Sequence, residues 1–282
     1  MNMAMIISQK NENIKASKTY IGANALFNFM RKYEYLESTL KRMSFIPRYY
    51  PETVGYLNIM IGEERVKEWY IPMCCFCDIP LHQLSVHAEG DNGYGKFGIA
   101  LHKQFGISRG ISPIHYINKS SVETESLSIA FNSMLATKDI DDEPYVEPME
   151  SHILDYVRLV KPLFGKMKRK LNSEGWEIVE KNFHDEHEWR YIPQSNPGYF
   201  PDMLVTERQK LSEAKSHLYT NSLSDAEDTW LKFEAQDIRY IFVDSHESVE
   251  KLVSFIRTEL EENIQDILLT KIVVYNDISE DW

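Results

Sequence analysis

The last part of the chain contains a strand–helix–strand pattern, and this feature constrains the fold most strongly. Residues 238–243 (IRYIFV) and 271–275 (KIVVY) are runs of β-branched and aromatic residues. The apolar residues between them recur at helical spacing: Val249, Leu252, Val253, Ile256 and Leu260. Residues 244–247 (DSHE) have the spacing of a capping box. Because a crossover helix returns the chain parallel to its first strand, the pattern predicts a parallel or mixed sheet covered by a helix.

The rest of the chain adds shorter elements of both kinds. Strands are predicted at 25–29 (ALFNF), 69–79 (WYIPMCCFCDI), 99–101, 114–117 and 186–192 (EHEWRYI), and helices at 35–43, 124–142 and 149–159. Residues 1–18 are polar and are expected to form a flexible lead-in. Residues 194–230 mix Pro, Gly, Ser and Asn with a weak helical pattern, which is typical of an insertion. We therefore expect one α+β domain over 19–282, with a mixed sheet, flanking helices and an insertion at 194–230.

Composition excludes several classes of protein. The 282 residues are 43% hydrophobic and 12% aromatic, which is enough apolar surface to outweigh chain entropy and exclude disorder over the whole length. No apolar run reaches the roughly 18 residues that span a bilayer, and the first residues do not resemble a secretion signal. The net charge of −12 disfavours wholesale wrapping of nucleic acid but leaves a local basic site open. A soluble, cytoplasmic protein is expected.

The three cysteines are clustered, which bears on both redox state and metal binding. Cys74, Cys75 and Cys77 lie within four residues, so no disulfide can join distant segments, and a reducing compartment is favoured. With His82 and His87 they could supply zinc ligands, but Cys75 and Cys77 would point in parallel from one strand face and no second CxxC occurs in the chain. A nucleophilic thiolate is a second alternative that would need a nearby histidine. Buried cysteines acting as small hydrophobes are the favoured interpretation, and no metal site is predicted.

A glycine-rich segment at 90–98 (GDNGYGKFG) is a candidate ligand loop. Its GYGKFG shares the glycine spacing of the dinucleotide fingerprint, in which the glycines follow a strand and open a helix. Here they lead instead into the strand-like residues 99–101, and no GKS or GKT of a phosphate-binding loop occurs. Two interpretations stay open: a tight glycine turn, or a backbone-lined ligand loop of another fold with Tyr94 beside Gly95.

Two charged segments are further candidates. On a strand, Glu186 and Glu188 would share one face, and neighbouring carboxylates can serve in acid–base chemistry or ribose binding. The alternative is a solvated strand edge with Arg190 nearby. The basic run Lys166–Lys170 could contact phosphate, or it could be a solvated helix end whose charges the helix dipole favours.

Three stretches together resemble the AbiGi-like abortive phage-resistance family. They are IPMCCFCDIPLHQLSVHAEGDNGYGKFGIALHKQFG, FHDEHEWRYIP and IRYIFVDSHESVEKLVSFI, and LFNFM…YLESTLKRMSFIPRYY near the N-terminus fits as well. The first two motifs are fairly specific, and the resemblance extends from about residue 20 to 275. It implies a bacterial anti-phage role, as the antitoxin half of a two-gene system whose other half is a nucleotidyltransferase-like toxin.

A weaker resemblance, at the level of the fold, is to ADP-ribosyltransferases. It implies that Tyr94 would stack on nicotinamide, that Glu188 would hold the ribose with Glu186 completing an E-x-E pair, and that Arg48 or Arg190 would meet the pyrophosphate of NAD. The early strand of such proteins often carries His (LFHF), whereas this chain has Asn28, which can bond a ribose hydroxyl but cannot carry a charge.

Two hypotheses follow. In the first, the chain is an antitoxin or sensor that acts by binding a partner protein, either a toxin or a phage component. In the alternative, it is an NAD-dependent, ADP-ribosyltransferase-like effector with Glu188, Glu186 and Tyr94 as catalytic residues and Asn28, Arg48, Tyr94, Gly95 and Arg190 as NAD contacts. Both place the site in a cleft expected between the strands of 74–101 and 186–192. The sequence leaves the choice between enzyme and binding protein open.

Overall fold

A large mixed sheet organises the molecule. The computed structural model describes residues 23–89, 93–136, 155–171, 175–193, 202–208 and 213–280. The strands of this sheet are β1 (Ala25–Met30), β3 (Arg48–Thr53), β4 (Met60–Ile61), β5 (Glu64–Cys77), β6 (Phe97–His102), β7 (Ser112–Pro113), β12 (Glu188–Tyr191), β13 (Met203–Thr206), β15 (Ile238–Val243) and β16 (Ile272–Val274). The main order is β16-β15-β6-β1-β5-β12-β7, with β3, β4 and β13 also paired to β5. The predicted α+β class with a mixed sheet is confirmed.

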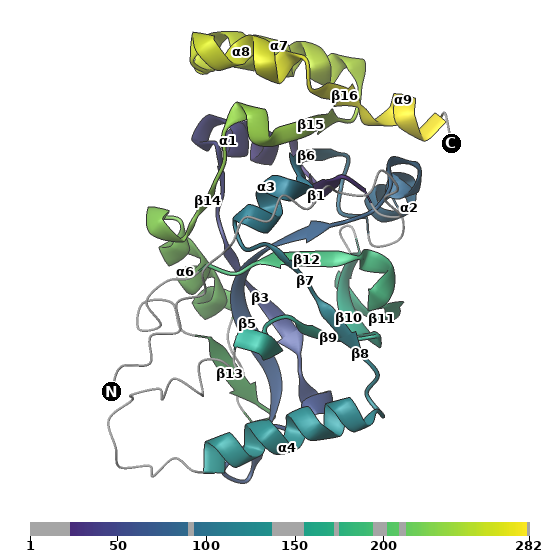
Figure 1. Ribbon diagram of the computed structural model, residues 1–282, viewed down its shortest axis with the longest axis vertical. Coiled ribbons are helices and arrows are strands. Elements are labelled where there is room, and N and C mark those ends of the chain that lie inside the picture. Colours follow the sequence, from purple (N-terminus) through teal and green to yellow (C-terminus); the bar gives the residue numbers. More distant parts are fainter. Residues whose placement is uncertain are drawn as a thin grey trace, which may run out of the picture.

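Helices and three small strand pairs complete the fold (Figure 1). The helices are α1 (Tyr33–Arg42), α2 (Leu84–Glu89), α3 (Lys103–Ser108), α4 (Val122–Ala136), α6 (Glu213–Leu223), α7 (His246–Glu259), α8 (Glu262–Leu269) and α9 (Tyr275–Glu280). The pairs are β2 (Ser44–Phe45) with β14 (Leu231–Lys232), β8 (His115–Ile117) with β9 (Val160–Pro162), and β10 (Phe164–Leu171) with β11 (Gly175–Asn182). Short 3₁₀ turns include η1 (Gly55–Leu57) and η3 (Phe183–Glu186).

The strand–helix–strand pattern folds as the sequence predicts. Strands β15 and β16 pair in parallel, and α7 and α8 lie between them in the chain. The Ser245 hydroxyl caps α7 by accepting a bond from the backbone N–H of Ser248 at 3.4 Å. The N-cap residue is therefore Ser245, one residue after the Asp244 that the DSHE spacing predicts. Together with α1, this unit covers one end of the molecule in Figure 1.

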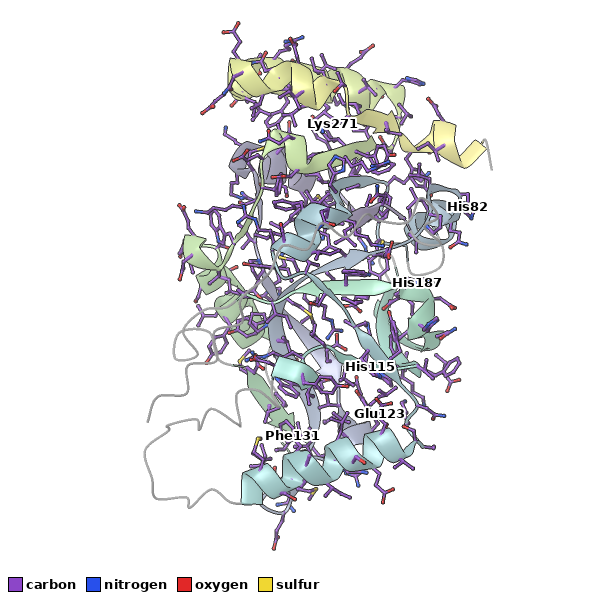
Figure 2. All side chains as sticks on the ribbon, in the orientation of Figure 1. His82, His115, Glu123, Phe131, His187 and Lys271 are labelled. Carbon is purple, nitrogen blue, oxygen red and sulfur yellow. The ribbon has the colours of Figure 1, made fainter. Side chains whose placement is uncertain are left out.

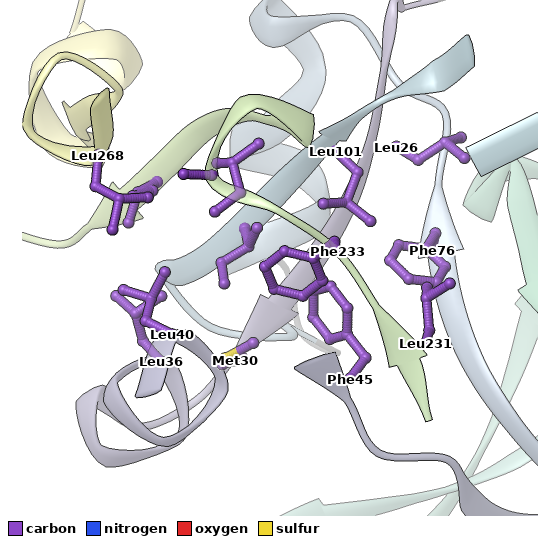
Figure 3. Close-up of a cluster of buried hydrophobic side chains, with 14 of the residues drawn as sticks. Leu26, Met30, Leu36, Leu40, Phe45, Phe76, Leu101, Leu231, Phe233 and Leu268 are labelled. Atoms are coloured by element: carbon purple, nitrogen blue, oxygen red, sulfur yellow. The ribbon is translucent and has the colours of Figure 1, made fainter. Parts of the chain in front are cut away.

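Strand β5 connects two hydrophobic cores. The core toward α1, α7 and α8 includes Leu26, Phe76 and Leu268, and Figure 3 shows several of its side chains converging between these helices and the sheet. The core toward α4 contains Trp69, whose ring lies 5.8 Å from that of Phe131 on α4. At the start of α4, His115 Nε2 of β8 lies 2.9 Å from Glu123 Oε1 (Figure 2). Because β5 is 14 residues long, its two halves belong to different cores.

Several predicted boundaries need correction or fall outside the described residues. The basic run Lys166–Lys170 is not a helix end but lies on β10, where the sheet register sets Lys166 opposite Glu180 of β11. Of the helix predicted over 149–159, residues 155–157 are helical and β9 already begins at Val160. The predicted strands at 99–101 and 114–117 are confirmed as β6, which pairs with β1 and β15, and β8, which pairs with β9.

The predicted lead-in at 1–18 and residues 137–142 of the helix predicted over 124–142 lie outside the described residues. The described parts of the predicted insertion contain β13, which pairs antiparallel with β5, and α6. The division of the chain into lead-in, domain and insertion stays a prediction.

Candidate functional site: a buried charge cluster

Strand β12 places two charged side chains in the interior. Glu188 is 7% exposed and Arg190 is completely buried. The two residues are separated by one position, so their side chains leave the same face of the strand. Arg190 Nε donates to Glu188 Oε1 at 2.7 Å. The antiparallel register with β5 fixes this pair in place, with Glu188 opposite Cys77 and Arg190 opposite Cys75.

Lys161 of β9 joins the two glutamates that the sequence singles out. Its Nζ donates to Glu186 Oε2 at 2.9 Å and to Glu188 Oε2 at 2.8 Å. The ammonium also lies 4.5 Å from the ring centroid of Phe183. Burial by itself would lower the pKa of Lys161, but the nearby carboxylates, Glu188 first, raise this pKa well above its ordinary value. The Lys161 side chain is therefore charged although it is buried.

Arg190 is held from a second strand as well. Its Nη2 donates to Glu52 Oε1 of β3 at 2.6 Å, and its Nη1 donates to the carbonyl oxygen of Arg158 at 2.7 Å. Burial acts to lower the pKa of Arg190, but the Glu188 and Glu52 carboxylates outweigh burial and raise it. Each of the three guanidinium nitrogens thus has its own acceptor, which is the geometry that arginine's fixed fork favours.

The outer side of this group is closed by Tyr94 and Lys181. The Tyr94 hydroxyl donates to Glu186 Oε1 at 2.7 Å, and Lys181 Nζ lies 2.6 Å from the same oxygen. The Lys181 ammonium is 5.3 Å from the centroid of the Tyr94 ring. Burial and the Glu186 carboxylate raise the pKa of the Tyr94 hydroxyl, which is therefore protonated. The hydroxyl oxygen of Tyr116 accepts a bond from the backbone N–H of Glu188 at 2.9 Å.

These residues form a buried charge cluster in which opposite charges balance. Its members are Glu52, Lys161, Lys181, Glu186, Glu188 and Arg190. Burial would raise the pKa of Glu188, but the charges of Arg190 and Lys161 hold this pKa well below its usual range. The pKa of Glu186 is likewise lowered, because Lys161 and Lys181 outweigh burial and the repulsion from Glu188. Glu186, Glu188, Lys161 and Arg190 are therefore all ionised, and the cluster as a whole contains three acidic and three basic side chains.

The whole cluster lies within a segment that matches a known family. The family model described as "Putative abortive phage resistance protein AbiGi, antitoxin" matches residues 43–244. The chain belongs to the AbiGi family. It is 48% identical over 251 residues to the abortive phage resistance protein AbiGi of Lactococcus lactis subsp. cremoris. The alignment covers 85% of this chain and 100% of that protein. The predicted membership in this phage-resistance family is confirmed.

Comparison with solved structures gives no significant match. The resemblance to ADP-ribosyltransferases therefore finds no support from the fold. Within the part of the chain that the structure describes, none of the helices is both long enough and apolar enough to cross a bilayer.

The structure brings together four of the site residues predicted for this AbiGi protein. Tyr94, Glu186, Glu188 and Arg190 meet in the cluster. Gly95 is next to Tyr94, with a φ of 105°, and its N–H donates to the carbonyl of Ala88 at 3.3 Å. Residues 90–92 lie outside the described residues, and the choice between a tight glycine turn and a ligand loop stays a prediction.

Asn28 and Arg48 take no part in the cluster's hydrogen bonds. Asn28 Nδ2 donates to the carbonyl oxygen of Cys75 at 2.9 Å. Arg48 is exposed at the start of β3, with its guanidinium carbon 5.9 Å from the Tyr35 ring centroid. NAD binding stays a prediction, and it would require Glu188 and Arg190 to leave their present ion pairs.

Two expectations about the site are wrong. Strand β12 is hydrogen-bonded directly to β5 over Cys74–Cys77, so these segments are adjacent strands of one sheet and enclose no cleft. Glu186 does not lie on the strand with Glu188 but ends the 3₁₀ turn η3, and His187 between them adopts a left-handed conformation with a φ of 44°. The two glutamates nevertheless meet, because Lys161 bonds to both.

Sequence reasoning missed Lys161, Lys181 and Glu52. Lys161 stands alone in an apolar stretch, LVKPLF, and an isolated charge among apolar residues is a signal that it is buried with a partner. Nothing comparable marks Glu52 or Lys181, because each lies in a strand that also carries exposed polar residues.

The cysteines behave as small hydrophobes. Cys74 is buried in the core toward α1, and Cys77 is buried in a third, smaller core. Burial raises the pKa of all three thiols, Cys75 included. A raised pKa keeps the thiol protonated and unreactive. Among the described residues, no three His, Cys, Asp or Glu side chains are grouped so that they could hold a metal ion.

Proposed function

We propose that this protein acts in abortive phage resistance as an antitoxin that binds and restrains a partner protein. The family description names an antitoxin, and the relative from Lactococcus lactis is named for phage resistance. An antitoxin of this kind needs a stable, specific surface and no reactive group. The partner that the family resemblance implies is the toxin half of a two-gene system.

The observation that carries the proposal is the closed state of the buried charge cluster. A general acid or base must reach its substrate and must exchange a proton near neutral pH. Glu186 and Glu188 are almost entirely buried, ionised, and bonded to Lys161, Lys181 and Arg190. These contacts tie β3, β9, β11 and β12 together, so they support a structural role for the cluster and binding as the function of the molecule.

Coexpression with the toxin half tests the proposal. Toxin expressed alone should arrest bacterial growth, and coexpression of this chain should restore growth and yield a complex that coelutes in size-exclusion chromatography. A control variant, Lys232→Ala, changes an exposed side chain and should leave both the restored growth and the coelution unchanged. Growth arrest by this chain alone, or restored growth without any complex, would contradict the proposal.

Thermal unfolding with NAD separates this proposal from the enzyme alternative. A ligand that binds only the folded state adds about 2.7 kcal/mol at a hundredfold excess over its dissociation constant, which moves Tm by several degrees. The antitoxin proposal expects no shift of Tm in millimolar NAD. A shift that is lost in Glu188→Gln would support the NAD-dependent effector instead.

A further inference from the structure

An exposed group of basic and aromatic side chains lies where α1 meets the start of β3. We call it the basic–aromatic patch, and its members are Lys32, Tyr35, Arg42, Arg48 and Tyr50. All five are exposed. The patch is unexpected on a chain that carries 12 net negative charges. Strand β3 also carries Glu52 of the buried charge cluster, but Arg48 is exposed and forms none of the cluster's ion pairs.

The aromatic rings of the patch are held between cations. Lys32 Nζ and the guanidinium carbon of Arg48 each lie 5.9 Å from the centroid of the Tyr35 ring. Tyr35 is still 44% exposed, so much of its ring is open to solvent. Tyr50 is two residues from Arg48 on the same strand, so both side chains leave the same face, and it is 41% exposed.

The positive charges of the patch are not neutralised by the protein. Burial and the charge of Arg48 both lower the pKa of Arg42, and Arg42 Nη1 donates to the Ser38 hydroxyl of the same helix at 2.5 Å. Among the described residues, neither forms an ion pair with a carboxylate. Lys41, next to Arg42 on α1, bonds instead to Glu259 of α7 at 2.9 Å. Lys32 and Arg48 therefore place two positive charges at one exposed ring, with Arg42 on the same helix as that ring, and an anion would be attracted to such a site.

We propose that the basic–aromatic patch binds single-stranded RNA, with phosphate between Arg42 and Arg48 and bases stacked on Tyr35 and Tyr50. Arginine recognises phosphate through paired N–H donors, and exposed tyrosines stack unpaired bases. An acidic protein segment would use the same arginines but would gain little from two exposed rings beside them. The proposal does not depend on the antitoxin function, because that function concerns a protein partner.

Fluorescence polarisation with a labelled single-stranded RNA of about 12 nucleotides tests the proposal, since single-strand sites cover about 4–16 nucleotides. Arg48→Ala and Tyr35→Ala should each weaken binding about tenfold. Lys41→Ala also removes one positive charge, from α1 outside the patch, and it should leave the affinity within about twofold. The slope of log affinity against log salt should fall by about 0.7 in Arg48→Ala, because one phosphate contact is lost.

Two further measurements keep the result decisive. Arg48→Lys should recover part of the affinity, and all variants should keep the melting temperature of the wild type because the changed side chains are exposed. RNA affinity that is equal in wild type and Arg48→Ala would overturn the proposal. Tighter binding of a labelled polyglutamate peptide than of RNA, with loss in Arg48→Ala but not in Tyr35→Ala, would overturn it in favour of an acidic protein partner.

Discussion

Arg190 is the residue on which the charge balance of the interior depends. Its guanidinium bonds to two carboxylates, Glu52 and Glu188, and to one backbone carbonyl. Removing it would leave the partly buried Glu52 without its ion-pair partner and would leave Glu188 with Lys161 as its remaining cation. A buried ion pair adds little stability compared with an apolar pair of the same shape, but breaking one from a single side is costly. The cluster therefore makes the fold sensitive to single substitutions.

Arg190→Ala should lower the free energy of unfolding by about 3–5 kcal/mol, because Glu52 loses its ion-pair partner and Glu188 loses one of its two. Urea unfolding followed by circular dichroism measures this change. The control is Arg208→Ala, whose side chain is 79% exposed and lies 3.5 Å from Glu64, and which should cost less than about 1 kcal/mol. Equal effects of the two substitutions would mean that the cluster does not stabilise the protein.

The ionised state of Glu188 makes stability depend on acid pH. Arg190 and Lys161 outweigh burial and hold the pKa of Glu188 below its unfolded value of about 4.3. A group of this kind contributes stability above the unfolded pKa and loses it as the pH falls toward the folded pKa. The free energy of unfolding should therefore decrease from about pH 5 downward, and less steeply in Glu188→Gln.

Urea unfolding at a series of pH values measures that slope. Glu227→Gln is the matched control, because Glu227 is exposed and its ion pair is with the exposed Lys232. Its pH profile should follow that of the wild type. A profile of Glu188→Gln that is as steep as the wild type would show that other carboxylates cause the acid sensitivity.

At the scale of elements, the turn before β6 depends on one glycine. Gly95 has a φ of 105°, and a Cβ added there would clash with the carbonyl oxygen of Met30 and the Cα of Arg31. Met30 ends β1, and β1 pairs with β6, so this close approach fixes how the turn meets the sheet. Tyr94, which closes the buried charge cluster, lies next to it.

Gly95→Ala should therefore destabilise the protein by more than about 1 kcal/mol, because a side chain at this φ is strained and the neighbouring backbone must move. Thermal unfolding measures the loss. Gly55→Ala serves as the control, since a Cβ at Gly55 would meet nothing within 4 Å, and its effect should be small. An unchanged Tm in Gly95→Ala would show that the backbone around residue 95 can shift to accept a side chain without loss of stability.

Elements are predictable from sequence where their signal is local. Helix α7 and strands β15 and β16 follow from apolar spacing within about ten residues of one another. The cluster could not be predicted in the same way, because Arg190 and Glu52 are 138 residues apart and meet only through β5. The cleft was wrongly predicted for the same reason, since periodicity identifies strands but does not reveal that β12 and β5 are neighbours.

At the scale of the whole molecule, β5 makes the two cores interdependent. Trp69, Ile71 and Met73 of this strand belong to the core near α4, and Cys74 and Phe76 belong to the core near α1. No turn separates these residues, so the strand cannot leave one core without disturbing the other. The buried charge cluster strengthens this connection, because it joins β3 on one half of β5 to β12 on the other.

We therefore expect both cores to unfold in one transition. Two variants can report on them separately: one keeps only Trp69 and the other only Trp189, which packs against the core near α1, with the remaining tryptophans replaced by Phe. In each variant, the urea midpoint from tryptophan fluorescence should coincide with the midpoint from far-ultraviolet circular dichroism, which follows the whole chain. Comparison within each variant removes the effect of the substitutions on stability. A fluorescence midpoint that differs from the dichroism midpoint in either variant would show that the two ends of β5 unfold independently, as separate cooperative units.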